Sequence, residues 1–103
     1  MAEFTNGGGQ IDLDAALLLV REYRSRYPQN VKAHLVSASV IRLILDQPGC
    51  AGIRIYQGMN PDGTLAPVCV GVDSEGDDMT DGVLTDRFGP CPPLCTESSV
   101  LMS

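Results

Sequence analysis

The hydrophobic period of this chain changes at Pro48-Gly49, and that change constrains the fold more than any other feature of the sequence. Before this point, apolar residues recur at the spacing of amphipathic helices. Beyond residue 50, apolar and polar residues alternate, as they do in strands with one buried face. The sequence therefore predicts an α+β fold, with an N-terminal helical hairpin packed on a small antiparallel sheet of two to three strands and an extended C-terminal arm.

Two helices are expected before the change of period. The first covers residues 12–27, because Asp12 can cap its free amides and Pro28 stops its propagation. The second runs from about Val31 to Leu45, with Asn30 as its cap. A short turn between them indicates an antiparallel pair.

Both helices carry more apolar side chains than a two-layer domain can cover. The residues outside the main stripes are Leu18 and Leu19 in the first helix and Leu35, Val36 and Leu43 in the second. Exposed apolar surface of this kind usually marks a contact with another molecule. We therefore expect these leucines to bind a protein partner, most simply a second copy of the chain in a homo-oligomer.

The second half of the chain is expected to contain a β-hairpin. The strands are GIRIYQGM (52–59) and VCVGVD (68–73), and NPDGT between them is typical of a turn. Residues 83–88, VLTDRF, form a candidate third strand. Alternation predicts that one set of side chains faces the helices: Ile53, Ile55, Val68, Val70 and Val72.

These elements define the expected organisation of the chain. Residues 11–90 are expected to form a single α+β domain, preceded by a flexible lead-in at residues 1–10 with three consecutive glycines. Residues 91–103 show neither period and are expected to form an extended arm that contains cysteine and proline.

The sequence CPPLC (91–95) opens the arm and has four possible interpretations. Cys91 and Pro92 both precede proline, which favours an extended backbone. In a fully extended arm the two Cα atoms would lie roughly 12 Å apart, whereas a disulfide needs about 4.4 to 6.8 Å. A stiff arm with packed or free thiols is therefore favoured, since both a disulfide and a shared zinc need a sharp bend or a cis proline. Redox chemistry of the thioredoxin type is disfavoured because the spacing is not C-x-x-C.

A zinc site is the alternative that uses the largest number of candidate residues. Cys91 and Cys95 could bind the metal together with Cys50, Cys69 or His34. Core packing is the more ordinary role for a cysteine within a strand, such as Cys69. His34 is expected on the apolar side of the second helix, where a buried histidine with a backbone partner is more common than a ligand. No cofactor other than zinc is suggested.

The charge of the chain argues against nucleic acid as a partner. The net charge is -6 and only seven residues are Lys or Arg, so a basic stripe for phosphate is missing. The longest uncharged apolar run is far shorter than the ~20 residues that span a bilayer. The N-terminus has neither the basic start nor the apolar core of a secretory signal, which leaves the cytoplasm as the expected location.

Four segments together resemble a group of small uncharacterised bacterial proteins. These segments are QPGCAGIRIY (47–56), VCVGVD (68–73), the acidic GDD (76–78) and CPPLC (91–95). The group shares a G-I-R-x-Y strand, a V-G-V-D strand end and a C-P-P-x-C tail. The resemblance covers roughly residues 30 to 95, implies a bacterial cytosolic protein and transfers no functional residue.

No constellation of catalytic residues is evident in the chain. We therefore expect a small non-enzymatic interaction or assembly module that associates with itself. A thiolate zinc protein is the alternative, and a small enzyme without a recognisable motif is the third possibility.

Overall fold

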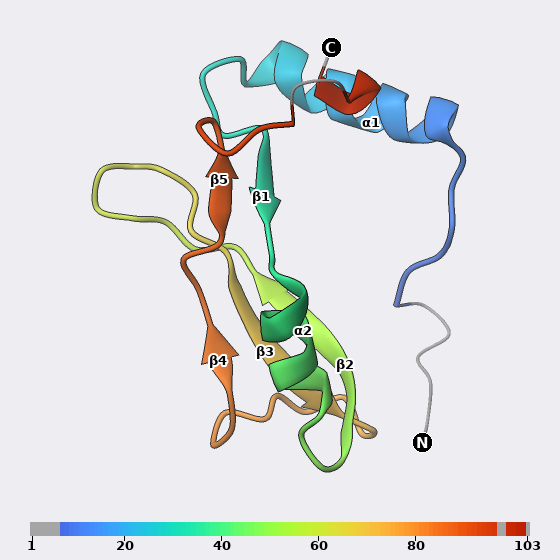
Figure 1. Ribbon diagram of the computed structural model, residues 1–103, viewed down its shortest axis with the longest axis vertical. Helices are drawn as coiled ribbons and strands as arrows, with labels where there is room; N and C mark the ends of the chain where they lie inside the picture. Colours follow the sequence, from blue (N-terminus) through green and yellow to red (C-terminus); the bar gives the residue numbers. More distant parts are fainter. Residues whose placement is uncertain (1–6, 97–98, 103) are drawn as a thin grey trace. The chain divides into compact units, whose positions relative to one another are not determined.

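The computed structural model describes residues 7–96 and 99–102 and confirms the α+β class (Figure 1). The chain divides into two compact units. Unit 1 contains Val36–Phe88, and unit 2 combines Gly8–Leu35 with Gly89–Ser103. Most of the predicted lead-in, residues 1–6, lies outside the described residues. Neither of the described α-helices is long and apolar enough to cross a membrane.

Unit 1 is built on the predicted hairpin and its third strand. The strands are β2 (Cys50–Tyr56), β3 (Val68–Asp73) and β4 (Leu84–Thr85), and they form an antiparallel sheet in the order β2-β3-β4. This hairpin and the third strand were expected from the alternating sequence, and both predictions are confirmed. The helix α2 (Ala38–Leu45) packs on β2 and β3.

The second helix begins later than predicted, and the expected helix over Val31–Leu45 is wrong in its first half. Residues Ala33–Leu35 form the strand β1. The cap of α2 is Ser37, whose hydroxyl accepts a hydrogen bond from the Val40 N–H at 3.3 Å. Asn30, the predicted cap, instead donates from its side chain to a tyrosine hydroxyl. The strand β1 therefore separates the two helices along the chain, where a short turn was predicted.

The main core cluster of unit 1 lies between α2 and one face of the sheet, and Val70 and Val72 are buried on the other face. Its centre is Ile44, which is 1% exposed. Ile44 clusters with Cys50, Cys69 and Phe88, all buried. Partly buried apolar side chains surround this cluster: Val36, Val40, Ile53, Met79 and Val83.

The register of the hairpin shows that the five side chains predicted to face the helices do not share one face. Ile53 lies opposite Gly71 and Ile55 opposite Cys69, whereas Val70 lies opposite Arg54. Opposed residues share a face, so the two isoleucines lie on the face of Cys69 and the valines of β3 lie on the other. Ile55 is 60% exposed near the end of β2 and does not belong to the core. A shift of register by one residue exchanges the faces, and alternation alone does not determine the register.

Unit 2 consists of α1 (Leu13–Arg26), β1, β5 (Gly89–Cys91) and the short 3-10 helix η1 (Val100–Met102). The predicted cap of α1 is confirmed, because the Asp12 carboxylate accepts a hydrogen bond from the Ala15 N–H at 2.8 Å. Strands β1 and β5 pair antiparallel, and α1 contacts η1. Residues 89–91 thus belong to a strand pair, and the predicted boundary between domain and arm at residue 90 falls inside β5.

The core predicts a clear difference between two isoleucine truncations. Ile44→Ala should lower the free energy of unfolding by about 2–5 kcal/mol, because it leaves a cavity in the buried cluster. Ile55→Ala, its matched control on the exposed end of β2, should cost less than about 1 kcal/mol. Urea unfolding followed by circular dichroism measures both. Equal losses for the two variants would contradict this assignment of the core.

Candidate functional site

The two cysteines of CPPLC are joined by a disulfide bond, and their Cα atoms lie 4.8 Å apart. The predicted stiff extended arm with about 12 Å between these atoms is therefore wrong. The peptide bonds before Pro92 and Pro93 are cis. Backbone hydrogen bonds close the turn: the Leu94 N–H donates to the Pro90 carbonyl at 2.8 Å, and the Cys95 N–H donates to the Pro93 carbonyl at 3.0 Å. The disulfide, one of the four interpretations, is the state in the structure.

The two sulfur-bearing residues of this turn differ in exposure. Cys91 is 2% exposed, and its sulfur lies 3.9 Å from the sulfur of Met102 in η1. Its carbonyl accepts a hydrogen bond from the Lys32 N–H at 2.7 Å, next to the β1–β5 pairing. Cys95 is exposed to solvent. One end of the disulfide thus belongs to a buried residue of unit 2, and the other end belongs to an exposed residue.

The other two cysteines are buried free thiols in the core of unit 1. The Cys50 thiol donates a hydrogen bond to the Gly52 carbonyl at 3.2 Å. Burial raises the pKa of the Cys69 thiol, so this group stays protonated at neutral pH. A metal binds the thiolate and not the thiol, so the structure favours a packing role for Cys69.

His34 lies in β1 opposite Pro90, and not on a helix as predicted. Its buried Nε2 has no hydrogen-bond partner among the residues that the structure describes. The five predicted zinc ligands thus divide between a disulfide, two buried thiols of unit 1 and a histidine of unit 2. Within residues 7–96 and 99–102, no three His, Cys, Asp or Glu side chains lie together in a way that could hold a metal ion.

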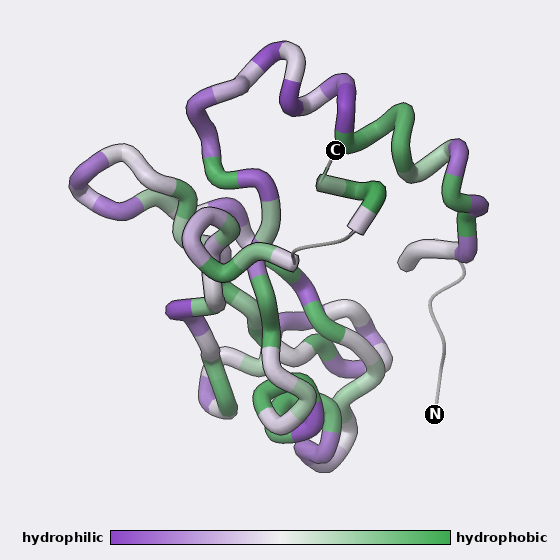
Figure 2. The backbone as a smooth tube through the Cα atoms, turned by 45° about the horizontal axis from the view of Figure 1, so that its top comes forward, coloured by the Kyte–Doolittle hydropathy of each residue, from purple (hydrophilic) through white to green (hydrophobic). Residues whose placement is uncertain are grey.

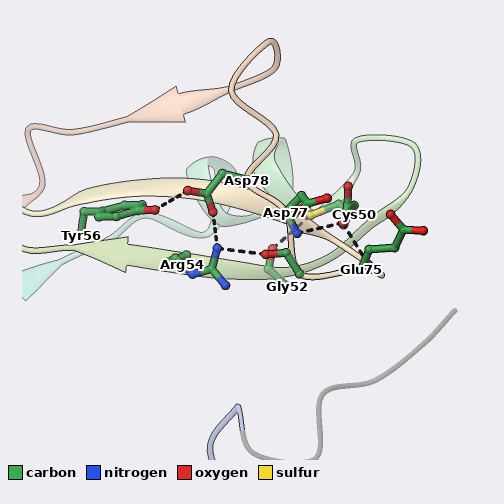
Figure 3. Close-up of polar contacts among 9 residues, drawn as sticks. Cys50, Gly52, Arg54, Tyr56, Glu75, Asp77 and Asp78 are labelled. Carbon is green, nitrogen blue, oxygen red and sulfur yellow. Dashed lines mark hydrogen bonds and ion pairs between the residues drawn. The ribbon is translucent and has the colours of Figure 1, made fainter.

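A polar cluster on unit 1 was not predicted as a site. The Asp78 carboxylate accepts hydrogen bonds from the Arg54 guanidinium and the Tyr56 hydroxyl (Figure 3). Arg54 also donates to the Gly76 carbonyl at 3.2 Å. These bonds hold the acidic loop after β3 against the face of β2 that carries Arg54 and Tyr56. Arg54 and Tyr56 share a face because they lie two residues apart in β2, whereas the position of Asp78 depends on how the loop folds.

The electrostatics of this cluster favour the ion pair and hydrogen bond that hold the loop in place. The hydrogen bond from Tyr56, together with Arg54, lowers the pKa of Asp78. The same contact with Asp78 raises the pKa of the Tyr56 hydroxyl, which remains protonated. A general base needs a pKa near the working pH, and both groups are shifted away from neutrality.

The predicted interaction leucines are all exposed. Leu18 is 73% exposed, Leu19 66%, Leu35 64% and Leu43 56%. They belong to three elements: the first two lie on α1, Leu35 on β1 and Leu43 on α2. Of these four, only Leu18 and Leu19 are adjacent in the sequence, and they belong to the apolar stretch 15–20 of α1. Figure 2 shows a hydrophobic stretch along this helix. No residue of α1 is buried.

Comparison of the chain with protein families, with curated proteins and with solved structures found no match.

The state of the cysteines predicts that folding does not require a metal ion. Cys91 and Cys95 are bonded to each other, and the Cys69 thiol is protonated, so no thiolate set is ready for zinc. Treatment with EDTA should leave the circular dichroism spectrum and the melting temperature unchanged. Unfolding on chelation, with release of about one zinc ion per chain, would contradict this expectation.

The Asp78 cluster predicts a stability difference that depends on pH. Because the pKa of Asp78 is lowered in the folded state, its contribution is complete above the unfolded pKa of about 3.9 and is lost as the pH falls through the lower folded value. Asp78→Asn, which resembles the protonated carboxyl, should melt earlier than wild type at neutral pH and converge with it in acid. Asp77→Asn in the same exposed loop is the matched control. A pH-independent difference for Asp78→Asn would contradict the assigned contacts.

Proposed function

We propose that the protein is a small non-enzymatic interaction module that associates with a second copy of itself through α1. The observation that supports this proposal is that unit 2 buries very little of its apolar surface. Among its described residues only Cys91 is buried, although the unit contains a 14-residue helix with exposed leucines. A small unit that buries so little of its apolar surface is marginally stable unless a covalent link, a metal or a partner supports it.

A second copy supplies the missing contact at the apolar middle of α1. Burying a leucine fully contributes about 1.5–3 kcal/mol, and a two-fold axis brings the same pair from both copies together. Leu18 lies 73% exposed at the centre of the helix, with Leu19 beside it. The proposed interface therefore uses the part of α1 that a monomer leaves in water.

The charges along α1 favour antiparallel pairing. Asp14 lies four residues before Leu18 and Arg21 three residues after it, so all three share one side of the helix. In an antiparallel pair centred near Leu18, Asp14 of one copy lies beside Arg21 of the other. Each copy thus contributes one acidic and one basic residue, which supports a closed dimer over an open chain of copies.

The proposal includes a cellular location and a class of partner. We place it in the cytoplasm, without a membrane or nucleic-acid partner. The net charge of -6, with seven basic residues, repels a phosphate backbone and supports this choice. The proposed partner is therefore protein.

Substitutions on α1 test the self-association. Sedimentation at micromolar concentration should show a dimer for the wild type, and Leu18→Glu should weaken dimerisation on the order of ten- to a hundredfold, because a charge replaces a buried leucine. The control is Met59→Glu, which changes an exposed apolar residue on the β2–β3 connection and should remain dimeric. A single wild-type species at the monomer mass of 11.0 kDa overturns the proposal.

Charge exchange tests the orientation of the two helices. Asp14→Arg and Arg21→Asp should each weaken the dimer, and the double variant should recover most of the lost affinity. Leu43→Glu on α2 should leave the dimer unchanged. If Leu43→Glu dissociates the dimer and Leu18→Glu does not, the interface lies on unit 1 and the proposed use of α1 is wrong.

A further inference from the structure

We propose that the Cys91–Cys95 disulfide is a thiol–disulfide exchange site, with a thiol compound as its substrate and the sulfur of Cys95 as the point of attack. This inference concerns reactivity and does not depend on self-association. It rests on two observations: which chain segments the bond connects, and how differently its two ends are exposed.

The disulfide is poorly placed to support the fold. Unit 2 joins two distant chain segments, Gly8–Leu35 and Gly89–Ser103, and both cysteines lie in the second. The sequence separation is 4, so the bond closes one turn and cross-links nothing else. The entropic stabilisation by a disulfide grows with the length of the closed loop, so this bond constrains the unfolded chain only weakly. The two segments are instead connected by the β1–β5 pairing and by α1 with η1.

The two ends of the bond differ in the way that exchange requires. Attack needs access along the line of the S–S bond to one sulfur, while the other sulfur leaves. Cys95 is exposed, whereas Cys91 is 2% exposed and lies against Met102. A small thiolate can therefore reach Cys95, and Cys91 is the leaving group. Direct attack at Cys91 would require η1 to move away.

The exchange is balanced as follows. A thiolate attacks the sulfur of Cys95, the Cys91–Cys95 bond breaks, and Cys91 leaves as a thiolate. A second thiolate then attacks the reagent sulfur of the mixed disulfide, so that the reagent disulfide forms and Cys95 leaves as a thiolate. The two cysteine thiolates take up two protons from water. The protein disulfide gains two electrons, and two reagent thiols are oxidised to one disulfide.

The proposed cytoplasmic location supports a reactive and not a structural bond. Disulfides that form in a reducing compartment are usually transient and are catalytic or redox-sensing. This argument rests on the proposed location, whereas the arguments from topology and exposure do not. The experiment below uses purified protein, so its result does not depend on the compartment.

The first experiment measures reduction of the folded protein. Oxidised wild-type protein is incubated with reduced glutathione or dithiothreitol without denaturant, and samples are quenched by alkylation and mapped by mass spectrometry. Reduction of Cys91–Cys95 should be complete while the circular dichroism remains folded and while the buried Cys50 and Cys69 stay unmodified. A disulfide that resists reduction until denaturant is added overturns the proposal.

The second experiment identifies the attacked sulfur with two matched variants. Cys91→Ala treated with oxidised glutathione should take up one glutathione at Cys95, at least about tenfold faster than Cys95→Ala takes it up at Cys91, because thiol reactivity follows access. Equal rates in the two variants overturn the assigned polarity. If either variant does not fold, alkylation of the reduced wild type replaces it: Cys95 must react before Cys91, and the reverse order contradicts the proposal.

Discussion

The packing of Ile44 against the β2–β3 hairpin is the interaction on which unit 1 depends, because a sheet of three short strands is marginal in water without a covering layer. Gln47 extends this contact beyond the end of α2. Its amide donates to the Ile44 carbonyl at 2.9 Å, and its side-chain carbonyl accepts from the Val83 N–H at 2.8 Å. A Cβ at Gly82 would lie 2.2 Å from the Gln47 oxygen, and one at Gly71 would lie 2.8 Å from its nitrogen, so the Gln47 side chain would have to move to make room for either.

Unit 2 is organised by different interactions, since Cys91 is the one buried residue among those that the structure describes in it. Its two chain segments meet through backbone hydrogen bonds of β1 and β5 and through the contact of α1 with η1. A pair of three-residue strands contributes little alone, and the disulfide does not connect the segments. The proposed dimer and the proposed reactivity both follow from the small number of buried side chains in unit 2. Apolar helix surface remains available to a partner, and the sulfur of Cys95 remains available to a thiol.

The parts of the fold that could be predicted from the sequence depend on neighbours along the chain. Asp12 caps α1 within its own first turn, and the hairpin follows from two alternating segments around a turn. The predictions were wrong where the local structure depends on residues that are distant in the sequence. Residues Ala33–Leu35 became a strand because β5 lies beside them, which left Ser37 to cap α2. Ile55 was assigned to the core because alternation specifies two faces but not the register that turns one of them toward α2.

The candidate site was even less predictable from neighbouring residues, because the reactivity proposed for it depends on the burial of each cysteine and not on their spacing. CPPLC was identifiable as the one clustered pair of cysteines, yet the proline rule that favours an extended arm considers only adjacent residues. In the structure the turn is closed by the Leu94 hydrogen bond to Pro90, and Met102, eleven residues beyond Cys91, packs on the inner sulfur. Spacing therefore suggests that the two sulfurs meet, but it is the packing of unit 2 around Cys91, with β1 and Met102 beside it, that makes the two residues unequal in exposure. That inequality distinguishes an exchange site, with one sulfur to attack and one to leave, from a disulfide buried at both ends.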